Sequence, residues 1–417
     1  MGSSFAPGPG ASAGGMKPAS FAQKLWRFCD NPRVKETALI EPMHERIRRD
    51  SAQSPGVLLA VHDWSTLSFG GHESKKDRAT LTHAHDVGYD LATVLMVRGC
   101  DGAPIAPVVV SLEADAVVHS SRDNPHPLNM CHVDQVLGNM KYTKAQKFGP
   151  TVVHVIDREA DSVNHWRQWS GDGHLALVRA DDRVVLYQGK ETKLAAIADG
   201  LRDANALKDT RAVVFHGRKA RQFVGEAEVV LHRPGKRNVG KGKKVDVPGP
   251  PLTLRLIVSE VRDLKGRLLA RWLLLTNVPT ELADAATIAL WYYFRWRIES
   301  MHKLIKSAGW QLESWLQRDG GKILIKLLVA FGAGASIWTL ERKLDAESEA
   351  FKALLMHLSG RQTKRNRRIT TSGMLAGLWV LQAALDPLAR HGPEKLNAML
   401  ENHLPLFAMT RKAIRLV

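Results

Sequence analysis

The side chains best suited to chemistry gather in one short stretch, WYYFRWRIESMHKLIKSAGW, residues 291–310. Its candidate functional residues are Tyr292, Arg295, Glu299 and Lys306. At about 100° per residue these four fall within an arc of about 60° on an α-helix, and apolar residues fall on the other side. A carboxylate beside cationic and hydroxyl groups suits a site that binds a metal ion and holds a phosphate backbone. The alternative is an ordinary surface pair, because Glu and Arg four residues apart commonly pair on exposed helices.

Two aspartates follow apolar runs that read as buried strands. The run Val57–His62 leads to Asp63, and the run Thr151–Ile156 leads to Asp157 in the sequence DREAD. We expect each strand to end at its aspartate. A single Asp in that place is more often a helix cap or turn residue, but two of them followed by the helical Glu299 favour a site that the three acids share.

These motifs resemble those of a known family. The spacing Tyr, two residues, Arg, three residues, Glu, six residues, Lys is similar to the YREK signature of DDE transposases of bacterial insertion sequences, which resemble hairpin-forming cut-and-paste transposases. The segments DWSTLSF (63–69) and DREAD (157–161) resemble the family's first and second acidic motifs, and Trp272–Thr276 resembles a segment that lies before the signature helix. The resemblance covers about Val57 to Gly309.

The resemblance implies roles for particular residues. Asp63, Asp157 and Glu299 would be the catalytic triad and the ligands of two Mg²⁺ ions, for which Mn²⁺ is expected to substitute. Tyr292, Arg295, Lys306 and Trp272 would contact DNA. For Trp272 the implied role is stacking on a base that is flipped out as a DNA hairpin forms; a tryptophan in the core of a strand is the competing interpretation.

The resemblance also implies the fold class: α/β, with a ribonuclease-H-like catalytic core interrupted by a β-rich insertion and flanked by helical N- and C-terminal regions. The expected divisions are a disordered Gly, Ala, Ser and Pro tract (1–18), an N-terminal helical DNA-binding segment (19–56), the first part of the core (57–186), the insertion (187–280), the second part of the core (281–345) and a C-terminal helical dimerisation region (346–417).

Local patterns predict the elements that must position these residues. Asn31-Pro32 is typical of a helix start, so a helix is expected from there to about Arg49. Further expected elements are strands at 93–97 and 105–112 joined by a turn at Asp101-Gly102, helices at 133–147 and 160–169, and a strand at 174–179.

Composition favours a polyanionic partner. The chain has 59 Lys and Arg against 42 Asp and Glu, a formal net charge of +17, which points to nucleic acid. Three cysteines, Cys29, Cys100 and Cys131, lack metal-ligand spacing and fit a reducing cytoplasm. The resemblance implies that this cytoplasm is bacterial and that the protein lies on nucleoid DNA. The apolar stretch 327–340 is 14 residues long, too short to span a bilayer, so no membrane partner is expected.

The function expected from these observations is a Mg²⁺-dependent DNA transposase that cleaves element ends and joins them to target DNA. Its partners would be double-stranded DNA, both terminal inverted repeats and target, and a second copy of the chain, forming a homodimer on paired ends. Two alternatives remain at this stage. One is a non-catalytic DNA-binding or inhibitory variant that dimerises with an active copy, and the other is a structure-specific nuclease on the same scaffold.

Overall fold

The computed structural model describes residues 19–53, 56–81, 83, 85–238, 244–308, 310–360 and 369–403. The tract expected to be disordered, 1–18, lies outside the described residues. The described chain divides into two units. We call Arg33–His302 with Arg318–Ala335 the core unit, and Met1–Pro32, Lys303–Gln317 and Ser336–Val417 the helical unit. Each is described separately below.

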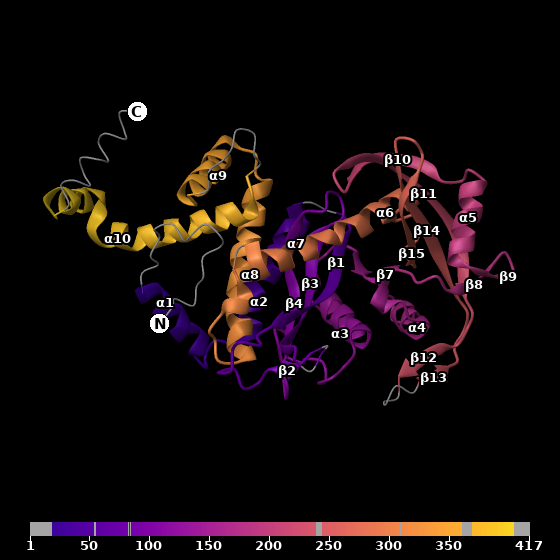
Figure 1. Cartoon of the computed structure of the whole chain (residues 1–417), viewed down its shortest axis with the longest axis horizontal. Helices are drawn as coiled ribbons and strands as arrows, with labels where there is room; N and C mark the ends of the chain where they lie inside the picture. Colours follow the sequence, from indigo (N-terminus) through magenta and orange to yellow (C-terminus); the bar gives the residue numbers. More distant parts are fainter. Residues whose placement is uncertain are drawn as a thin grey trace. The chain divides into compact units, whose positions relative to one another are not determined.

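A mixed β-sheet forms the centre of the core unit (Figure 1). Its order is β5-β4-β3-β1-β6-β7-β15-β14-β11-β8-β9, with β2 paired to β3 and β10 paired to β11. The strands are β1 (Leu58–Ser68), β2 (Ala79–Thr80), β3 (Val87–Arg98), β4 (Pro104–Glu113), β5 (Val118–Ser120), β6 (Val152–Ile156), β7 (Leu175–Arg179), β8 (Val184–Tyr187), β9 (Lys190–Lys193), β10 (Lys208–Phe215), β11 (Arg218–Leu231), β14 (Leu252–Asp263) and β15 (Leu268–Thr276). A separate hairpin pairs β12 (Gly235–Asn238) with β13 (Lys244–Val247).

Strand direction changes once within the part of the sheet that carries the expected acids. β4, β3 and β1 run antiparallel to one another, whereas β1, β6 and β7 are parallel. Nearly every residue of β3 and β4 is buried, which explains their continuous apolar sequence, because both faces of these strands are covered. The strands expected at 93–97, 105–112 and 174–179 are confirmed, and the first two extend further at both ends.

The expected β-rich region is present but is not set apart from the sheet. β15 pairs antiparallel with β7, with Leu275 opposite Val178, and β14, β11, β8 and β9 follow in order. Both of these side chains are fully buried. The apolar pairing therefore makes the region a continuation of the same sheet.

The expected end of the first strand is wrong. β1 continues through Asp63 to Ser68, because its pairing with β3 is unbroken from Leu58 opposite Arg98 to Ser68 opposite Gly88. Asp63 thus lies in mid-strand. β6 ends at Ile156, immediately before Asp157, as expected.

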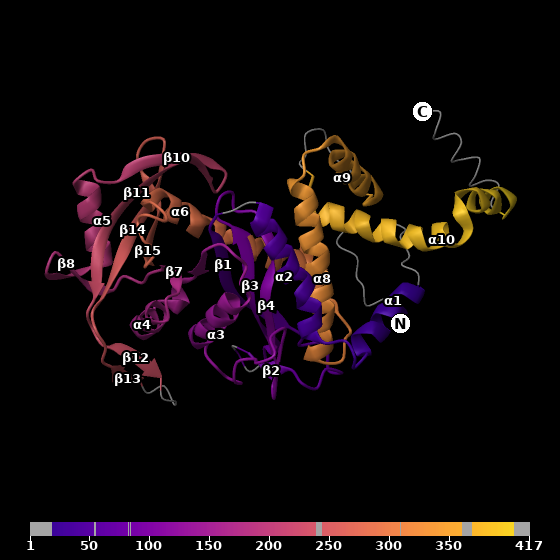
Figure 2. The same cartoon turned by 180° about the vertical axis from the view of Figure 1, so that it is seen from behind.

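Helices cover the sheet of the core unit (Figure 2). α3 (His132–Ala145) and α4 (Val163–Gly171) bury Val136, Trp166 and Trp169 in a cluster with the apolar residues of β6 and β7. Both helices were expected, although a 3₁₀ turn, Arg158–Ala160, takes the start expected for the second. α2 (Glu36–Gln53) packs along β4, and α5 (Leu194–Asp203) lies over β8 and β15.

The helix expected to begin at Asn31-Pro32 is displaced. α1 (Ala19–Asp30) ends first, and Asn31 donates its backbone N–H to the carbonyl of Phe28 at 3.2 Å, which closes a turn just before Pro32. α2 starts only at Glu36 and runs past Arg49.

The single helix expected through residues 292–306 is interrupted. α6 (Ala285–Phe294) and α7 (Trp296–Lys303) meet at Arg295, whose backbone N–H bonds to the carbonyl of Tyr292, three residues back, at 3.1 Å. Leu304–Ala308 then form a π-helical turn. Such turns interrupt an α-helix and change the angular position of the residues that follow.

The described part of the helical unit contains α1, α9 (Ala346–Leu358), α10 (Thr371–His403) and a 3₁₀ turn at Leu312–Ser314. α10 is kinked at Gly392, which has a φ of 70°. The expected helical character of the C-terminal region is confirmed for its described residues. Its role in dimerisation stays a prediction.

α8 (Gly320–Arg342) is longer than the 14-residue apolar stretch predicted. Among the described residues it is the helix whose length, 23 residues, and composition would allow it to cross a membrane. However, 67% of its most apolar window is buried inside the protein, and the core helices of soluble proteins pass the same test. Leu324, Leu327 and Phe331 are among its buried side chains.

Candidate active site

Neighbouring parallel strands bring two of the expected acids together. β1 and β6 pair in parallel with Val61 opposite Val155. Asp63 on β1 and Asp157 just past the end of β6 each lie two residues further along, so they occupy the same level of the sheet. Side chains alternate between the two faces of a strand, and both aspartates share the face of the Val61–Val155 pair. The Asp157 carboxylate also accepts the backbone N–H of Arg158 at 2.7 Å, as an N-terminal cap of the 3₁₀ turn.

The junction of α6 and α7 is docked on the turn between β3 and β4. The indole N–H of Trp291 donates to the carbonyl of Gly99 at 3.0 Å, and Nε of Arg297 donates to the carbonyl of Gly102 at 2.7 Å. Gly102 has a φ of +68°, and a Cβ there would come within 2.2 Å of the Phe294 ring. A glycine is therefore required at this contact, which fixes α7 beside the strands that carry the acids.

The guanidinium of Arg295 lies among all three expected acids. Its Nη1 is 3.8 Å from Oδ1 of Asp63 and its Nη2 is 3.5 Å from Oδ2 of Asp157. Nη2 also donates to Oε1 of Glu299, one helical turn away. Because Asp157 and Glu299 both lie within ion-pair distance of one nitrogen, they are necessarily close to each other. The three carboxylates and Arg295 are called the acidic cluster below.

The charges in this cluster are partly removed from solvent. The Arg295 side chain is 10% exposed, and those of Asp63, Asp157 and Glu299 are 19%, 36% and 33% exposed. Burial acts to lower the pKa of Arg295, but the surrounding anionic groups, Asp157 first, outweigh it and raise that pKa. One guanidinium faces three carboxylates, so the cluster retains negative charge that favours binding of a further cation.

Tyr292 supports Asp157 rather than facing solvent. Its hydroxyl donates to Oδ1 of Asp157 at 3.1 Å, and the residue is 8% exposed. Burial, with the nearby Asp157 charge, raises the pKa of the Tyr292 hydroxyl, so it stays a donor at neutral pH. In this structure the hydroxyl of Tyr292 and the guanidinium of Arg295 contact carboxylates. Their expected contacts with DNA stay predictions.

His302 is a site residue that sequence reasoning missed. Its Nδ1 lies 3.4 Å from Oδ2 of Asp63, and its side chain is 8% exposed. Its Nε2 is buried and has no hydrogen-bond partner among the described residues. A signal was present: at about 280° on the helical wheel, His302 lies just beside the arc of the four signature residues.

The chemistry of the acidic cluster suits a hard divalent cation, since Mg²⁺ and Mn²⁺ prefer carboxylate oxygens. The present arrangement places a guanidinium nitrogen between Asp157 and Glu299. Accordingly, over the described ranges no group of three or more His, Cys, Asp or Glu side chains is already spaced to hold a metal ion. Asp63, Asp157 and Glu299 could hold one if Arg295 moved away from the two carboxylates that it joins.

Lys306 belongs to the helical unit, unlike the acidic cluster. It lies on the π-helical turn, and its Nζ is 3.7 Å from Oε1 of Glu313. The sequence placed it on the same helical face as Glu299, and the π turn removes the basis of that expectation. Its contact with DNA stays a prediction.

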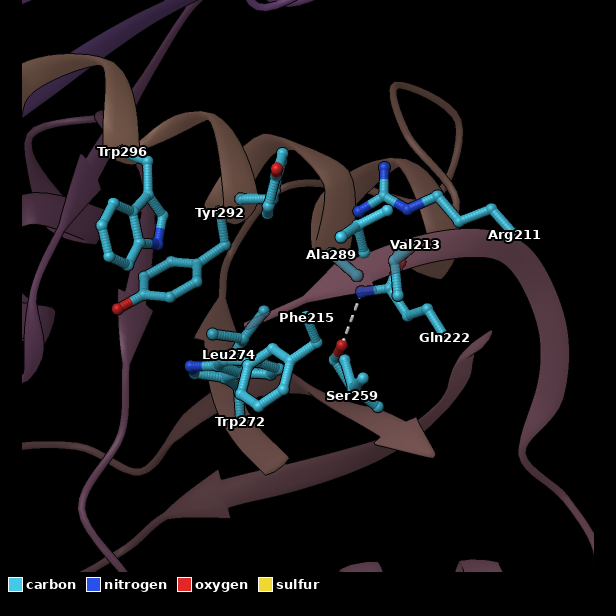
Figure 3. A pocket seen from close by; sticks show the side chains of 13 residues that line it. Arg211, Val213, Phe215, Gln222, Ser259, Trp272, Leu274, Ala289, Tyr292 and Trp296 are labelled. Carbon is cyan, nitrogen blue, oxygen red and sulfur yellow. Dashed lines mark hydrogen bonds between the residues drawn. The ribbon is translucent and has the colours of Figure 1, made fainter. Parts of the chain in front are cut away.

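Trp272 lines a pocket next to Tyr292 (Figure 3). The pocket has a volume of about 60 Å³ and lies between α6, β10, β14 and β15. Phe215 meets Trp272 edge to face at 6.2 Å between ring centroids, and Trp296, on the rim, is 60% exposed. Trp272 is thus partly buried and borders a cavity. This position is compatible both with a core tryptophan and with a residue that stacks on a base.

A histidine clamp holds the DREAD segment that follows β6. His132, at the start of α3, contacts Oδ2 of Asp90 at 2.7 Å through Nε2 and Oε1 of Glu159 at 3.1 Å through Nδ1. Its ring stacks on Trp64 with centroids 4.7 Å apart. Burial disfavours the charged imidazolium, but the hydrogen bonds to Asp90 and Glu159 outweigh this and raise the pKa of His132 to about 9. The clamp joins α3 to the turn that starts at Asp157.

The clamp predicts a pH dependence of stability. The folded-state pKa of His132 lies above its unfolded value of about 6.5. Its contribution to the free energy of unfolding is therefore complete below about pH 6.5 and is lost as pH rises through about 9. Between these limits the free energy of unfolding should fall more steeply for the natural protein than for His132→Gln, measured by urea denaturation at a series of pH values. His391→Gln, at an exposed position, should follow the natural protein; equal slopes for natural protein and His132→Gln would contradict the clamp.

Comparisons with known proteins give a structural likeness but no sequence match. No protein-family model matches the chain, and no curated protein matches it either. Among solved structures, the chain is similar to a cryo-EM structure of piggyBac transposase in a synaptic complex with hairpin DNA. The TM-score is 0.34 at 8% sequence identity, over 80% of this chain and 53% of that one. The chain therefore spans about half the length of that protein, and at this score the likeness carries no argument about the site.

Proposed function

We propose that this protein is a cut-and-paste DNA transposase with a ribonuclease-H-like core. The observation that carries the proposal is the acidic cluster: acids from β1, from the end of β6 and from α7 meet around Arg295. Capping or surface pairing explains a single acid at such a place but not three that are far apart in sequence. The order of β4, β3, β1, β6 and β7, antiparallel and then parallel, supports the ribonuclease-H-like assignment.

In the proposed reaction the chain's own residues arrange the acids. The Tyr292 hydroxyl orients Oδ1 of Asp157. Nη2 of Arg295 lies within ion-pair distance of both Oδ2 of Asp157 and Oε1 of Glu299, so it fixes these two carboxylates relative to each other. When bound, two Mg²⁺ ions would supply activation of the attacking hydroxyl and stabilisation of the departing oxygen of a phosphodiester. Release of Arg295 from the carboxylates would free its guanidinium to bind a DNA phosphate, for which its planar fork is well suited.

The pocket beside Tyr292 supports a role in holding an unstacked DNA base. Trp272, Phe215 and Trp296 surround it, and Arg211 lies over the ring of Tyr293, with Cζ 5.5 Å from the ring centroid. Aromatic side chains stack on bases without regard to sequence, and arginine adds cation–π attraction. We propose that Trp272 stacks there on a base flipped out during hairpin formation.

Trp272→Ala is expected to lower the yield of hairpin product by about 10- to 100-fold, because aromatic–base stacking contributes about 1–3 kcal/mol per base. The first nick should change much less, since it does not require the flipped base. A denaturing gel of end-labelled DNA separates the two products. Trp272→Phe, which keeps an aromatic ring, should retain most hairpin formation; equal hairpin yields for the Ala variant and the natural protein would exclude the stacking role.

The function is tested with labelled duplexes of the DNA that flanks the coding sequence on each side. Incubation with the protein and Mg²⁺ or Mn²⁺, resolved on a denaturing gel, should show nicks, hairpins and then strands joined to target DNA. Binding without any cleavage would instead indicate the non-catalytic variant. Hydrolysis without joining would indicate a nuclease.

Pairing of two ends by a homodimer is part of the proposal. When duplexes that carry the element ends are added, light scattering should give the mass of two protein chains bound to two duplexes. A single chain on a single end at concentrations that support joining would contradict it.

A further inference from the structure

A buried arginine outside the acidic cluster lacks a counter-ion. Arg122 lies between β5 and α3 and is 7% exposed. Within the described residues its guanidinium has neither a hydrogen-bond nor an ion-pair partner, and its Nε is fully buried and unsatisfied. Burial lowers the pKa of Arg122, with no carboxylate opposing that effect. Burying an unpaired charge costs free energy, so binding of an anion beside Arg122 would be favourable.

The guanidinium is held in place on α3. A Cβ at Gly138 would lie 3.2 Å from Nη1 of Arg122, so the helix presents bare backbone to the guanidinium. The Tyr142 ring, one turn further along α3, has its centroid 5.9 Å from Cζ. The backbone N–H of Arg122 is fixed by the hydroxyl of Ser120 at 3.1 Å. These contacts orient the side chain but none of them balances its charge.

Arg122 lines a cavity of about 510 Å³, within the usual range of small-ligand sites. Further polar side chains on its wall are Asn124, Tyr142 and Lys141, whose Nζ also pairs with Asp172 at 2.9 Å. The acids on the wall do not neutralise Arg122. Asp134 is engaged by Nε2 of His165 at 2.6 Å and by the thiol of Cys131 at 2.7 Å, and Asp123 is exposed and makes no ion pair with Arg122.

We propose that this cavity binds a phosphate group, with Arg122 as its principal donor. The arginine fork matches phosphate geometry, and polar groups from the loop and from α3 line the same cavity. The formal charge of +17 favours phosphate-bearing partners. The phosphate comes from a nucleic-acid backbone or from solution. The inference goes beyond the proposed function, because it uses no residue of the acidic cluster.

The test is a calorimetric titration of the full chain with sodium phosphate, at constant ionic strength in a chloride buffer without divalent ions. The natural protein should bind phosphate saturably. Arg122→Met should bind it about 10- to 100-fold more weakly, since a hydrogen bond to a charged group contributes about 1.5–3 kcal/mol. Arg318→Met, the same change at an exposed arginine, should bind as the natural protein does.

A second variant tests the proposal independently, in case Arg122→Met does not fold. Gly138→Ala keeps the charge and favours the helix, but its methyl group would press on Nη1; it should also weaken phosphate binding by at least about tenfold. Circular dichroism establishes that each variant is folded. No saturable binding by the natural protein, or folded Arg122→Met and Gly138→Ala proteins that bind within about threefold of it, would overturn the proposal.

Two arms distinguish the sources of the phosphate. If the group belongs to DNA, Arg122→Met should also weaken binding of a generic duplex, and sodium phosphate should compete with that duplex. If the group is free phosphate, duplex affinity should be the same for Arg122→Met and Arg318→Met while the phosphate titrations differ.

Discussion

Asp157→Asn is expected to reduce the rate of Mg²⁺-dependent cleavage of a DNA end by at least about 1,000-fold, as are Asp63→Asn and Glu299→Gln. Each change removes one of the three anionic groups that would hold the ions, and a loss of about 4 kcal/mol of transition-state stabilisation corresponds to that factor. Single-turnover cleavage of an end-labelled duplex, followed on a denaturing gel, measures the rate.

These amide variants should remain folded, because they preserve side-chain shape and relieve repulsion within the acidic cluster. A matched control is Asp203→Asn on α5, where the Asp203 side chain is 73% exposed; it should cleave at the natural rate. Cleavage within about tenfold of the natural rate by all three amide variants would remove the catalytic assignment.

Arg295→Met should lower the free energy of unfolding by about 2–4 kcal/mol at pH 7 without divalent ions. Removing one partner of a buried ion pair leaves an uncompensated charge, and here three carboxylates lose their common cation. The cost falls below that of a fully buried pair because Asp157 and Glu299 are 36% and 33% exposed. Urea denaturation measures the change.

Two comparisons isolate the cause of this loss. Mg²⁺ or Mn²⁺ should restore part of the stability of Arg295→Met, because a divalent ion would replace the missing cation. Arg202→Met, which breaks a surface pair with Asp199 at 3.0 Å, should cost less than about 1 kcal/mol. An Arg295→Met protein as stable as the Arg202→Met control would show that the guanidinium does not hold the acids together.

The positions of the three acids could be predicted from the sequence because the local residue pattern and the topology of the sheet agree there. Asp157 directly follows its strand because an apolar run ended there. Glu299 and Arg295 contact each other because they are four residues apart on nearly helical backbone. Parallel pairing of β1 with β6 then placed Asp63 beside Asp157, which needed only the correct faces of the two strands.

The rest depended on tertiary contacts that no local pattern carries. β1 continues past Asp63 because β3 pairs with it as far as Ser68, and the β-rich region joins the main sheet through the pairing of β15 with β7. The turn at Arg295 and the π turn at Lys306 break a periodicity that the sequence shows as unbroken. The bond from Tyr292 to Asp157 joins residues 135 positions apart.

Binding of divalent ions by Asp63, Asp157 and Glu299 together can be observed in a crystal of the protein with a DNA end grown in Mn²⁺. Anomalous diffraction from that crystal locates the metal. We expect two anomalous peaks in contact with oxygens of these three side chains, with the Arg295 guanidinium moved off Asp157 and Glu299. Manganese found elsewhere, with Arg295 still bound to all three carboxylates beside an intact DNA end, would contradict it.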